Sequence, residues 1–177
     1  MNRFADGGVV WLTGLSGTGK TTVAGLLDRR LRADGLLPVQ LDGDRLRSIM
    51  PVDLGYAPDD RRRLARSYAR LAADFAEQGH LVICATISLF HDVHAWNRAN
   101  LPTYLEVWLR APVTELRTRE GRDALYDRGG DVVGTGIDPE FPLHPDLVID
   151  NYPPVTAERA TELVRSAMFH RSRLDVR

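Results

Sequence analysis

The strongest constraint on the fold is a glycine-rich stretch, residues 14–21, with the sequence GLSGTGKT. It follows the apolar run GVVWL at residues 8–12 and precedes residues 20–33, where apolar side chains recur at helical spacing. Glycines allow successive backbone N–H groups to turn inward around a phosphate, and the start of the following helix adds positive potential. The pattern G-x-x-x-x-G-K-[ST] between a strand and a helix therefore predicts a phosphate-binding loop.

The polar residues of this loop have distinct expected tasks. Lys20 should reach the β- and γ-phosphates of a nucleotide, and the Thr21 hydroxyl should bind Mg²⁺. A glycine-rich turn with an exposed lysine, the alternative, would not explain the apolar strand before it and the amphipathic helix after it. The expected nucleotide-binding residues are Gly14, Ser16, Gly17, Thr18, Gly19, Lys20, Thr21 and Thr22.

Strand-like and helix-like segments alternate along the chain. Apolar runs predict strands at residues 8–12, 37–41, 81–87, 104–109 and 147–149. Helical periodicity predicts helices at residues 20–33, 58–78 and 156–170. The run LVICATI at residues 81–87 is almost wholly apolar, which is typical of a strand covered on both faces. We expect an α/β fold of three layers, with a mostly parallel central sheet of about five strands, in one domain spanning residues 1–177.

The stretch LDGDRLR, residues 41–47, has two interpretations. Taken alone it favours a solvated helix start, because Asp in a first turn caps free N–H groups and matches the helix dipole. In a parallel sheet, however, the carboxyl ends of the strands meet at one edge, so this stretch should lie beside the phosphates. There a carboxylate can hold Mg²⁺ through water and accept a proton, while arginines balance an anionic acceptor. The sheet context therefore favours half of an active site.

Composition limits the partners and the compartment. A formal charge of −1 over 177 residues provides no global basic field for a nucleic-acid backbone. The one cysteine, Cys84, lies in an apolar run, which predicts a core residue and excludes a disulfide framework. We find no apolar run of about 18 residues and no signal-like start, so we expect a soluble, cytoplasmic protein without a nucleic-acid or membrane partner.

Five stretches together resemble the adenylylsulfate kinase family over about residues 8–152. They are GLSGTGKTT, LDGDRLR, GYAPDDR at residues 55–61, ICATIS at residues 83–88 and TGID at residues 135–138. The resemblance implies a P-loop NTPase fold that commonly forms homodimers. It also implies transfer of a phosphoryl group from ATP to the ribose 3′-hydroxyl of a small nucleotide acceptor, adenylylsulfate, with ATP and Mg²⁺ as cofactors.

The same resemblance implies roles for individual residues. Lys20 and Asp44 would be catalytic, and Thr21 and Asp44 would hold the metal. Arg47 and Arg61 would hold the phosphosulfate end of the acceptor. The implied acceptor-binding residues are Asp42, Arg47, Arg61, Ile87 and Ser88, of which the last two would line the nucleoside pocket.

The acceptor half departs from the family pattern. Leu64 stands where the family has Asn, and LFH at residues 89–91 stands where it has P-Y-R. Residues 124–137 lack two lysines and a phenylalanine, and Asp127 replaces one of those lysines, which would repel a bound polyanion. The stretches ISLFHDVHAWNR and VVG-x-x-I-D resemble kinases of cytidine diphosphoramidate, so this acceptor is the alternative to adenylylsulfate.

Residues 117–145 combine charge, glycine and proline with little periodicity. We expect a mobile lid there, in which an arginine covers ATP. The sequence does not choose among Arg117, Arg119, Arg122 and Arg128.

Several other side chains have ordinary structural interpretations. His91, Asp92 and His94 indicate an exposed helix start rather than a metal site. Trp96 and Trp108 are expected in the core or an interface. Among the arginines after Arg61, we expect Arg62, Arg63 and Arg70 at the surface, and the direction of Arg66 is open.

Three classes of function remain. A small-molecule kinase is favoured, because a second anion site follows the phosphate-binding loop at a neighbouring strand end. A nucleotide-hydrolysing switch would need a water-positioning residue and a partner. A protein that binds ATP without turnover is disfavoured by the presence of Lys20, Thr21 and Asp44. Acceptor-dependent consumption of ATP separates the first class from the other two.

Overall fold

The computed structural model describes Phe4, residues 6–50, Gly55, residues 57–119, residues 138–169 and residues 174–175. Tyr56, most of the expected lid with Arg122, Asp127 and Arg128, and residues 135–137 of the TGID stretch therefore lie outside the described residues.

A parallel sheet forms the centre of the molecule, and its strand order is β2-β3-β1-β4-β5-β6. Every described pairing is parallel. The strands are β1 (Gly8–Thr13), β2 (Val39–Asp42), β3 (Leu81–Ala85), β4 (Tyr104–Arg110), β5 (Leu147–Asp150) and β6 (Leu174–Asp175). The five predicted strands are confirmed, and a two-residue strand adds an edge that the sequence did not predict. β3 ends two residues earlier than predicted, at Ala85, and this releases residues 86–90 from the sheet.

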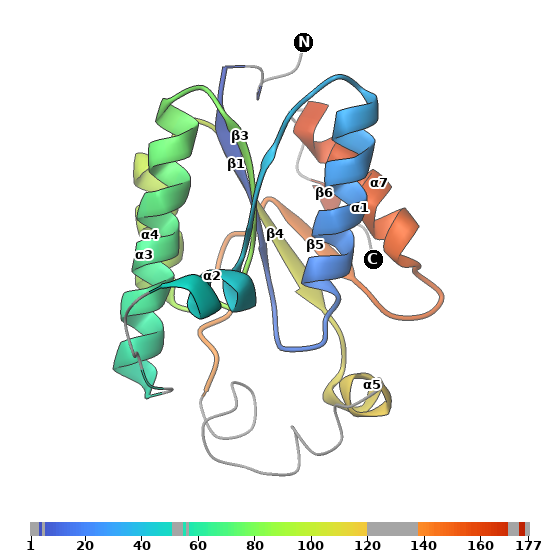
Figure 1. Ribbon diagram of the computed structural model, residues 1–177. Coiled ribbons are helices and arrows are strands. Elements are labelled where there is room, and N and C mark those ends of the chain that lie inside the picture. Colours follow the sequence, from blue (N-terminus) through green and yellow to red (C-terminus); the bar gives the residue numbers. More distant parts are fainter. Residues whose placement is uncertain are drawn as a thin grey trace.

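Helices cover both faces of the sheet. α3 (Pro58–Glu77) and α4 (His91–Asn100) lie on one side, and α1 (Lys20–Ala33) and α7 (Ala157–Phe169) lie on the other, as Figure 1 shows. Two short helices, α2 (Gly43–Ile49) and α5 (Val113–Thr118), follow β2 and β4. The predicted three-layer α/β fold is confirmed, whereas α5 takes in the first two residues of the expected lid, Arg117 and Thr118.

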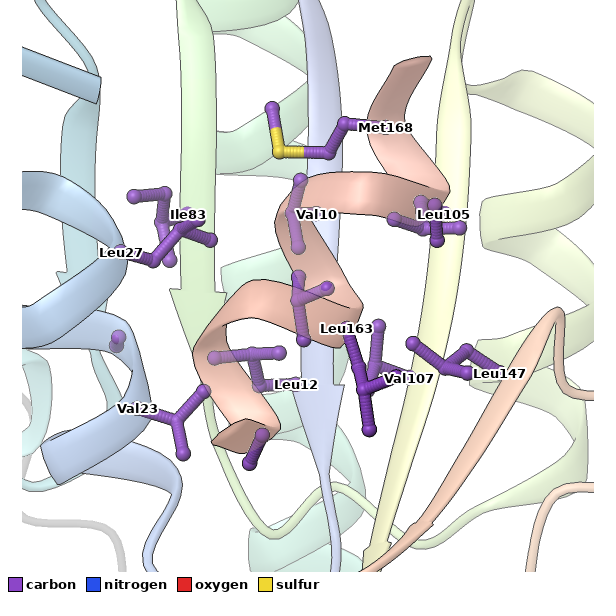
Figure 2. Packing of buried hydrophobic residues seen from close by; sticks show 14 of the residues in the cluster. Val10, Leu12, Val23, Leu27, Ile83, Leu105, Val107, Leu147, Leu163 and Met168 are labelled. Atoms are coloured by element: carbon purple, nitrogen blue, oxygen red, sulfur yellow. The ribbon is translucent and has the colours of Figure 1, made fainter. Parts of the chain in front are cut away.

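Side-chain alternation along β1 explains the two cores. Val10 and Leu12 pack with Leu27 of α1 and with Leu163 and Met168 of α7 (Figure 2). The alternate residues of β1 point to the other side of the sheet, because successive side chains of a strand face opposite sides. Thus Val9 and Trp11 pack beneath α3 and α4.

Cys84 of β3 is fully buried in the second core. Burial raises the pKa of its thiol well above the ordinary value, so the thiol stays protonated. The structure therefore places it as a core residue, as the apolar run predicted. Among the described helices, none combines the length and apolar character needed to cross a membrane.

Candidate active site

The carboxyl end of β1 leads into the phosphate-binding loop, whose path requires glycine at two points. Gly14 has φ of 147°, and a Cβ there would collide with the carbonyl oxygen of Leu109 on β4. Gly19 has φ of 89°, and a Cβ there would lie 2.6 Å from Nδ2 of Asn151. The loop is thus pressed against the ends of β4 and β5, where only glycine fits.

Lys20 opens α1, and its side chain folds back across the loop. Its Nζ donates to the carbonyl oxygens of Gly14 at 2.9 Å and Leu15 at 2.7 Å, and the residue is 9% exposed. Thr18 turns its hydroxyl inward to the Leu15 carbonyl at 2.9 Å. Gly14 and Thr18 therefore shape the loop. Lys20 places a largely buried positive charge at its centre.

Asp42 ends β2 and joins the two halves of the site. Its Oδ2 accepts a hydrogen bond from the Thr21 hydroxyl at 2.8 Å. Its Oδ1 accepts from the backbone N–H groups of Asp44 at 3.1 Å and Arg45 at 3.2 Å, which caps α2. The stretch LDGDRLR thus starts a helix and also lies beside the phosphate-binding loop.

Tyr68 of α3 supports the turn between Asp42 and Asp44. Its hydroxyl donates to the Gly43 carbonyl oxygen at 2.9 Å. Burial raises the pKa of Tyr68 to about 12, with smaller raising contributions from Asp44 and Asp42 and a lowering one from Arg47. The phenol therefore remains a donor throughout the pH range in which an enzyme is assayed.

We expect Tyr68→Phe to lower the free energy of unfolding by about 1 kcal/mol, because the Gly43 carbonyl loses its donor in a partly buried place. Urea unfolding measures this change. Tyr152→Phe is the matched control, since the Tyr152 hydroxyl makes no hydrogen bond with any residue that the structure describes. Equal stability of Tyr68→Phe and the unaltered protein would contradict the support given to the turn.

One pocket of about 400 Å³ lies along this edge of the sheet. It brings together most of the residues that the sequence predicted for the site: Ser16, Gly17, Gly19, Lys20, Thr21, Thr22, Asp42, Asp44, Arg47, Arg61, Ile87 and Ser88. Gly14 and Thr18, also predicted, do not line it.

The pocket also has walls beyond the predicted site residues. Tyr68 comes from the apolar face of α3 and was not singled out in the sequence, whereas Leu64 of the same face was noted there only as a departure from the family pattern. Residues 86–90 after β3, which we call the rim segment, supply Thr86, Leu89 and Phe90 as well. Position could have revealed the rim segment, because it follows a strand end already assigned to the site, whereas α3 does not follow the carboxyl end of a strand.

Buried apolar contacts tie the rim segment to its surroundings. Leu89 packs with Leu15 of the phosphate-binding loop and Leu116 of α5 in a small cluster. The Thr13 hydroxyl donates to the Ile87 carbonyl at 2.6 Å. The rim segment, the phosphate-binding loop and α5 therefore pack together.

Among the arginines considered for the lid, Arg119 reaches the loop. Its Nη1 donates to the Gly17 carbonyl and its Nη2 to the Asn151 carbonyl, both at 2.5 Å. It also lines the pocket. Arg117 is exposed and does not line the pocket.

The structure corrects two expectations about charged residues, those for His94 and Arg62, and gives the direction of Arg66, which the sequence left open. His94 is not at an exposed helix start, because it is 6% exposed beneath the rim segment. Arg62 is not a solvated surface residue, since it pairs with Asp92 and with Glu140, the latter at 2.7 Å. Arg66 pairs with Asp92 at 2.6 Å and does not line the pocket.

These ion pairs lower the pKa values of the carboxyl groups involved. Burial acts to raise the pKa of Asp92, but Arg66 and Arg62 together hold that pKa below its ordinary value. Arg62 also lies over the Phe90 ring, with 4.6 Å between the guanidinium carbon and the ring centroid. Arg62 therefore contacts Phe90, the last residue of the rim segment.

Trp96 packs against a core, as expected, whereas Trp108 is half-buried and belongs to neither of the two main cores. Trp96 is half-buried against the core beneath α3 and α4. Trp108 stacks on Phe141 with 5.0 Å between ring centroids.

Comparisons with known proteins agree on one family. The model of the adenylylsulphate kinase family matches residues 6–150. An adenylyl-sulfate kinase of Paraburkholderia xenovorans is 44% identical over 151 residues, which cover 82% of this chain and 84% of the relative. The cytidine diphosphoramidate kinase of Campylobacter jejuni is 34% identical over 160 residues, which cover 88% of this chain and 93% of the relative.

A solved structure extends the likeness to three dimensions. The Mycobacterium tuberculosis APS kinase in complex with AMPPNP and APS superposes with a TM-score of 0.82 at 29% identity, covering 93% of this chain and 99% of that one. The sequence match over most of the chain and the shared fold lead to the same conclusion. The chain belongs to the adenylylsulfate kinase family.

Proposed function

We propose that this kinase transfers the γ-phosphoryl group of ATP to the ribose 3′-hydroxyl of adenylylsulfate. The observation that carries the proposal is the single pocket shared by Lys20 and Thr21 of the phosphate-binding loop with Asp44, Arg47 and Arg61. Such a pocket can hold the phosphates of a donor beside an anionic acceptor. The complex of the M. tuberculosis relative with AMPPNP and APS supports the choice of both substrates.

The two aspartates of LDGD suit different tasks. Both oxygens of Asp42 already accept hydrogen bonds, one from Thr21 and the other from the α2 N–H groups. Asp44 is exposed to the pocket, where its carboxylate can accept the proton of the attacking hydroxyl. We therefore keep Asp44 as the proposed base.

The oxygen-rich junction of α1 and β2 suits Mg²⁺. The Thr21 hydroxyl and the carboxylates of Asp42 and Asp44 are hard oxygen ligands, which Mg²⁺ prefers to nitrogen or sulfur. Bound there with nucleotide, the ion would neutralise charge that develops on the phosphates. Asp42 thereby joins Thr21 and Asp44 in the proposed metal set, in addition to its predicted place on the acceptor side.

Arg47 and Arg61 fit the anionic end of the acceptor. Arg47 spans from α2 to Gly55, whose carbonyl oxygen accepts from Nη1 at 3.3 Å and from Nη2 at 3.2 Å. Both arginines line the pocket. Guanidinium groups can bind phosphate and sulfate oxygens in a bidentate way, so the two positions can orient the acceptor.

Cytidine diphosphoramidate is the second candidate acceptor. Leu64, which replaces a family Asn, lines the pocket and is 5% exposed. An apolar side chain there removes a hydrogen-bonding group from the acceptor side. The likeness to the C. jejuni kinase over 88% of the chain supports this alternative.

A panel of acceptors tests the proposed function. The purified protein would be incubated with ATP, Mg²⁺ and either adenylylsulfate or cytidine diphosphoramidate, and products would be read by mass spectrometry. A product heavier than one acceptor by one phosphoryl group identifies the substrate. ATP consumption that is equal with and without both acceptors would contradict the kinase proposal.

We expect Arg119→Ala to raise the KM for ATP by about tenfold or more, while the KM for the acceptor changes less. The guanidinium bridges the phosphate-binding loop and the loop after β5, and hydrogen bonds from charged groups contribute about 1.5–3 kcal/mol each. Steady-state kinetics with each substrate varied in turn measures the effect. Arg117→Ala is the control, and equal kinetics in the two variants would remove Arg119 from the ATP site.

The homodimer and the cytoplasmic location remain proposals that rest on the family resemblance and on composition. Light scattering of the purified protein should give twice the mass of one chain. A mass of one chain at micromolar concentration would contradict the dimer.

A further inference from the structure

His94 lies beneath the rim segment and is joined to the pocket through Ser88. The residue belongs to α4 and is 6% exposed. Its Nε2 lies 2.8 Å from the carbonyl oxygen of Ser88, and Ser88 lines the pocket. His94 itself does not line the pocket, so any effect on a ligand would pass through Ser88.

Ser88 has a backbone conformation that needs support. Its φ is +25°, an angle that residues with a side chain rarely adopt. Such a conformation persists only where the surroundings hold it on several sides. The Ser88 hydroxyl shares a hydrogen bond of 2.8 Å with the Thr86 hydroxyl, and the Ser88 carbonyl also accepts from the Phe90 N–H at 3.1 Å.

The neighbouring residues of the rim segment are held from other elements. Thr13 at the end of β1 binds the Ile87 carbonyl, and the Glu140 N–H donates to the Leu89 carbonyl at 3.2 Å. The bond from His94 is the one that joins Ser88 to α4. Losing it would leave the Ser88 carbonyl with only the local bond from the Phe90 N–H, while Ile87 and Leu89 stay attached to other elements.

The hydrogen-bond chemistry specifies which nitrogen of His94 carries the proton. A carbonyl oxygen only accepts, so Nε2 must be the donor. Nδ1 has no hydrogen-bond partner among the described residues and lies 3.4 Å from Oε1 of Glu106. Glu106 is itself held by Arg98 and by the Tyr104 hydroxyl, each at 3.1 Å.

Burial favours the neutral imidazole. It lowers the pKa of His94 below the ordinary value, outweighing the opposite effects of Glu106 and of the bond to Ser88. A neutral ring with its proton on Nε2 satisfies Ser88 and leaves a lone pair on Nδ1. The geometry and the burial therefore select one tautomer.

We propose that His94 is a positioning residue for the phosphoryl acceptor, acting through its Nε2–H bond to the Ser88 carbonyl to hold the rim segment in its binding shape. The inference rests on the proposed kinase function and adds a residue to it. His94 acts mainly on the acceptor side, because its bond ends at Ser88, whereas the rim segment meets the phosphate-binding loop through Leu89.

Three variants test the proposal by kinetics. His94→Phe keeps an aromatic ring but removes the donor, His94→Gln keeps an N–H group near the position of Nε2, and His80→Phe replaces an exposed histidine at the opposite end of the sheet. We expect His94→Phe to raise the KM for the acceptor by about tenfold, the size of one lost buried hydrogen bond. His94→Gln should recover most of that loss, and in all three variants the KM for ATP should stay within about twofold of the original, well under the effect of one lost bond. The acceptor would be whichever of adenylylsulfate and cytidine diphosphoramidate the unaltered protein phosphorylates.

A spectroscopic measurement on the unaltered protein supplies a second, independent readout. Nitrogen-15 NMR of the histidine rings at pH 8 should show His94 protonated at Nε2 and not at Nδ1. A ring without a proton on Nε2 would overturn the proposal even where variants fail to fold, because Nε2 could then not donate to the Ser88 carbonyl.

The outcomes separate this proposal from the proposed function. An unaltered protein without acceptor-dependent turnover contradicts the kinase function, and the positioning role falls with it. Normal turnover with an unchanged acceptor KM in His94→Phe overturns the positioning role alone. A joint rise in the KM values for ATP and acceptor, with a lowered Tm, would instead indicate general loss of packing and would also overturn it.

Discussion

Lys20→Ala is expected to lower kcat by about 10³-fold or more, the effect seen when a cation that stabilises transferring phosphoryl charge is removed. The Lys20 ammonium lies within the phosphate-binding loop, 2.9 Å from the Gly14 carbonyl oxygen and 2.7 Å from that of Leu15. Alanine would leave the loop without the charge that we propose to face the β- and γ-phosphates. Acceptor-dependent ADP formation measures the loss, and thermal melts show whether the variant is folded.

Arg63→Ala is the control for Lys20→Ala, since Arg63 is an exposed cation of α3 that does not line the pocket. A second check uses the fact that Lys20 is the only lysine among the 177 residues. An amine-reactive reagent should therefore modify one side chain, and ATP should protect it. Near-normal kcat in Lys20→Ala would refute phosphoryl transfer at this loop.

Asp44→Asn is expected to lower kcat by about 10²–10⁴-fold, the range for a lost general base, with little change in the KM for ATP. The substitution keeps the shape of the side chain and removes its negative charge. The helix cap should survive, because Asp42 and not Asp44 accepts the first N–H groups of α2. The variant should therefore melt within a few degrees of the unaltered protein, since caps and packing are retained.

Two companion variants sharpen this prediction. Asp59→Asn changes an exposed aspartate in the first turn of α3 and should leave kcat unchanged. Arg47→Ala should chiefly raise the KM for the acceptor, because it removes a charge-assisted contact of about 1.5–3 kcal/mol made in both ground and transition states. Unchanged kcat in Asp44→Asn together with an unchanged acceptor KM in Arg47→Ala would return the stretch to ordinary helix-start chemistry.

The sequence predicted the strand, the glycine-rich loop and the helix of residues 8–33 because this part of the chain follows local patterns. The strand of residues 8–13, the glycine-rich loop and α1 follow one another without interruption, and α1 begins and ends at the predicted residues, Lys20 and Ala33. Glycine, lysine and threonine have few alternative roles at those spacings. The parallel sheet followed from apolar runs that alternate with helical periodicity, since each element must bury its apolar side chains.

The acceptor half could be predicted only in part. The sequence showed that LDGDRLR adjoins a strand end. It could not distinguish the roles of Asp42 and Asp44, because Asp42 binds the Thr21 hydroxyl, which comes from another segment. Tyr68 and Leu64 have the spacing of an ordinary core face, and nothing local distinguishes the part of α3 that meets the pocket.

By itself, the sequence determined the α/β architecture, the phosphate-binding loop and the strand ends that adjoin the candidate site. These depend on short-range patterns of burial and backbone conformation. Only the tertiary structure decided the surroundings of single charged groups. Arg119 meets Gly17 across 102 residues, and Arg62 meets Glu140 across 78. His94 is buried against Glu106 of β4, although its neighbours in the sequence suggested an exposed helix start. Burial and pairing of a charge depend on which distant segments pack around it, and no local pattern contains that information.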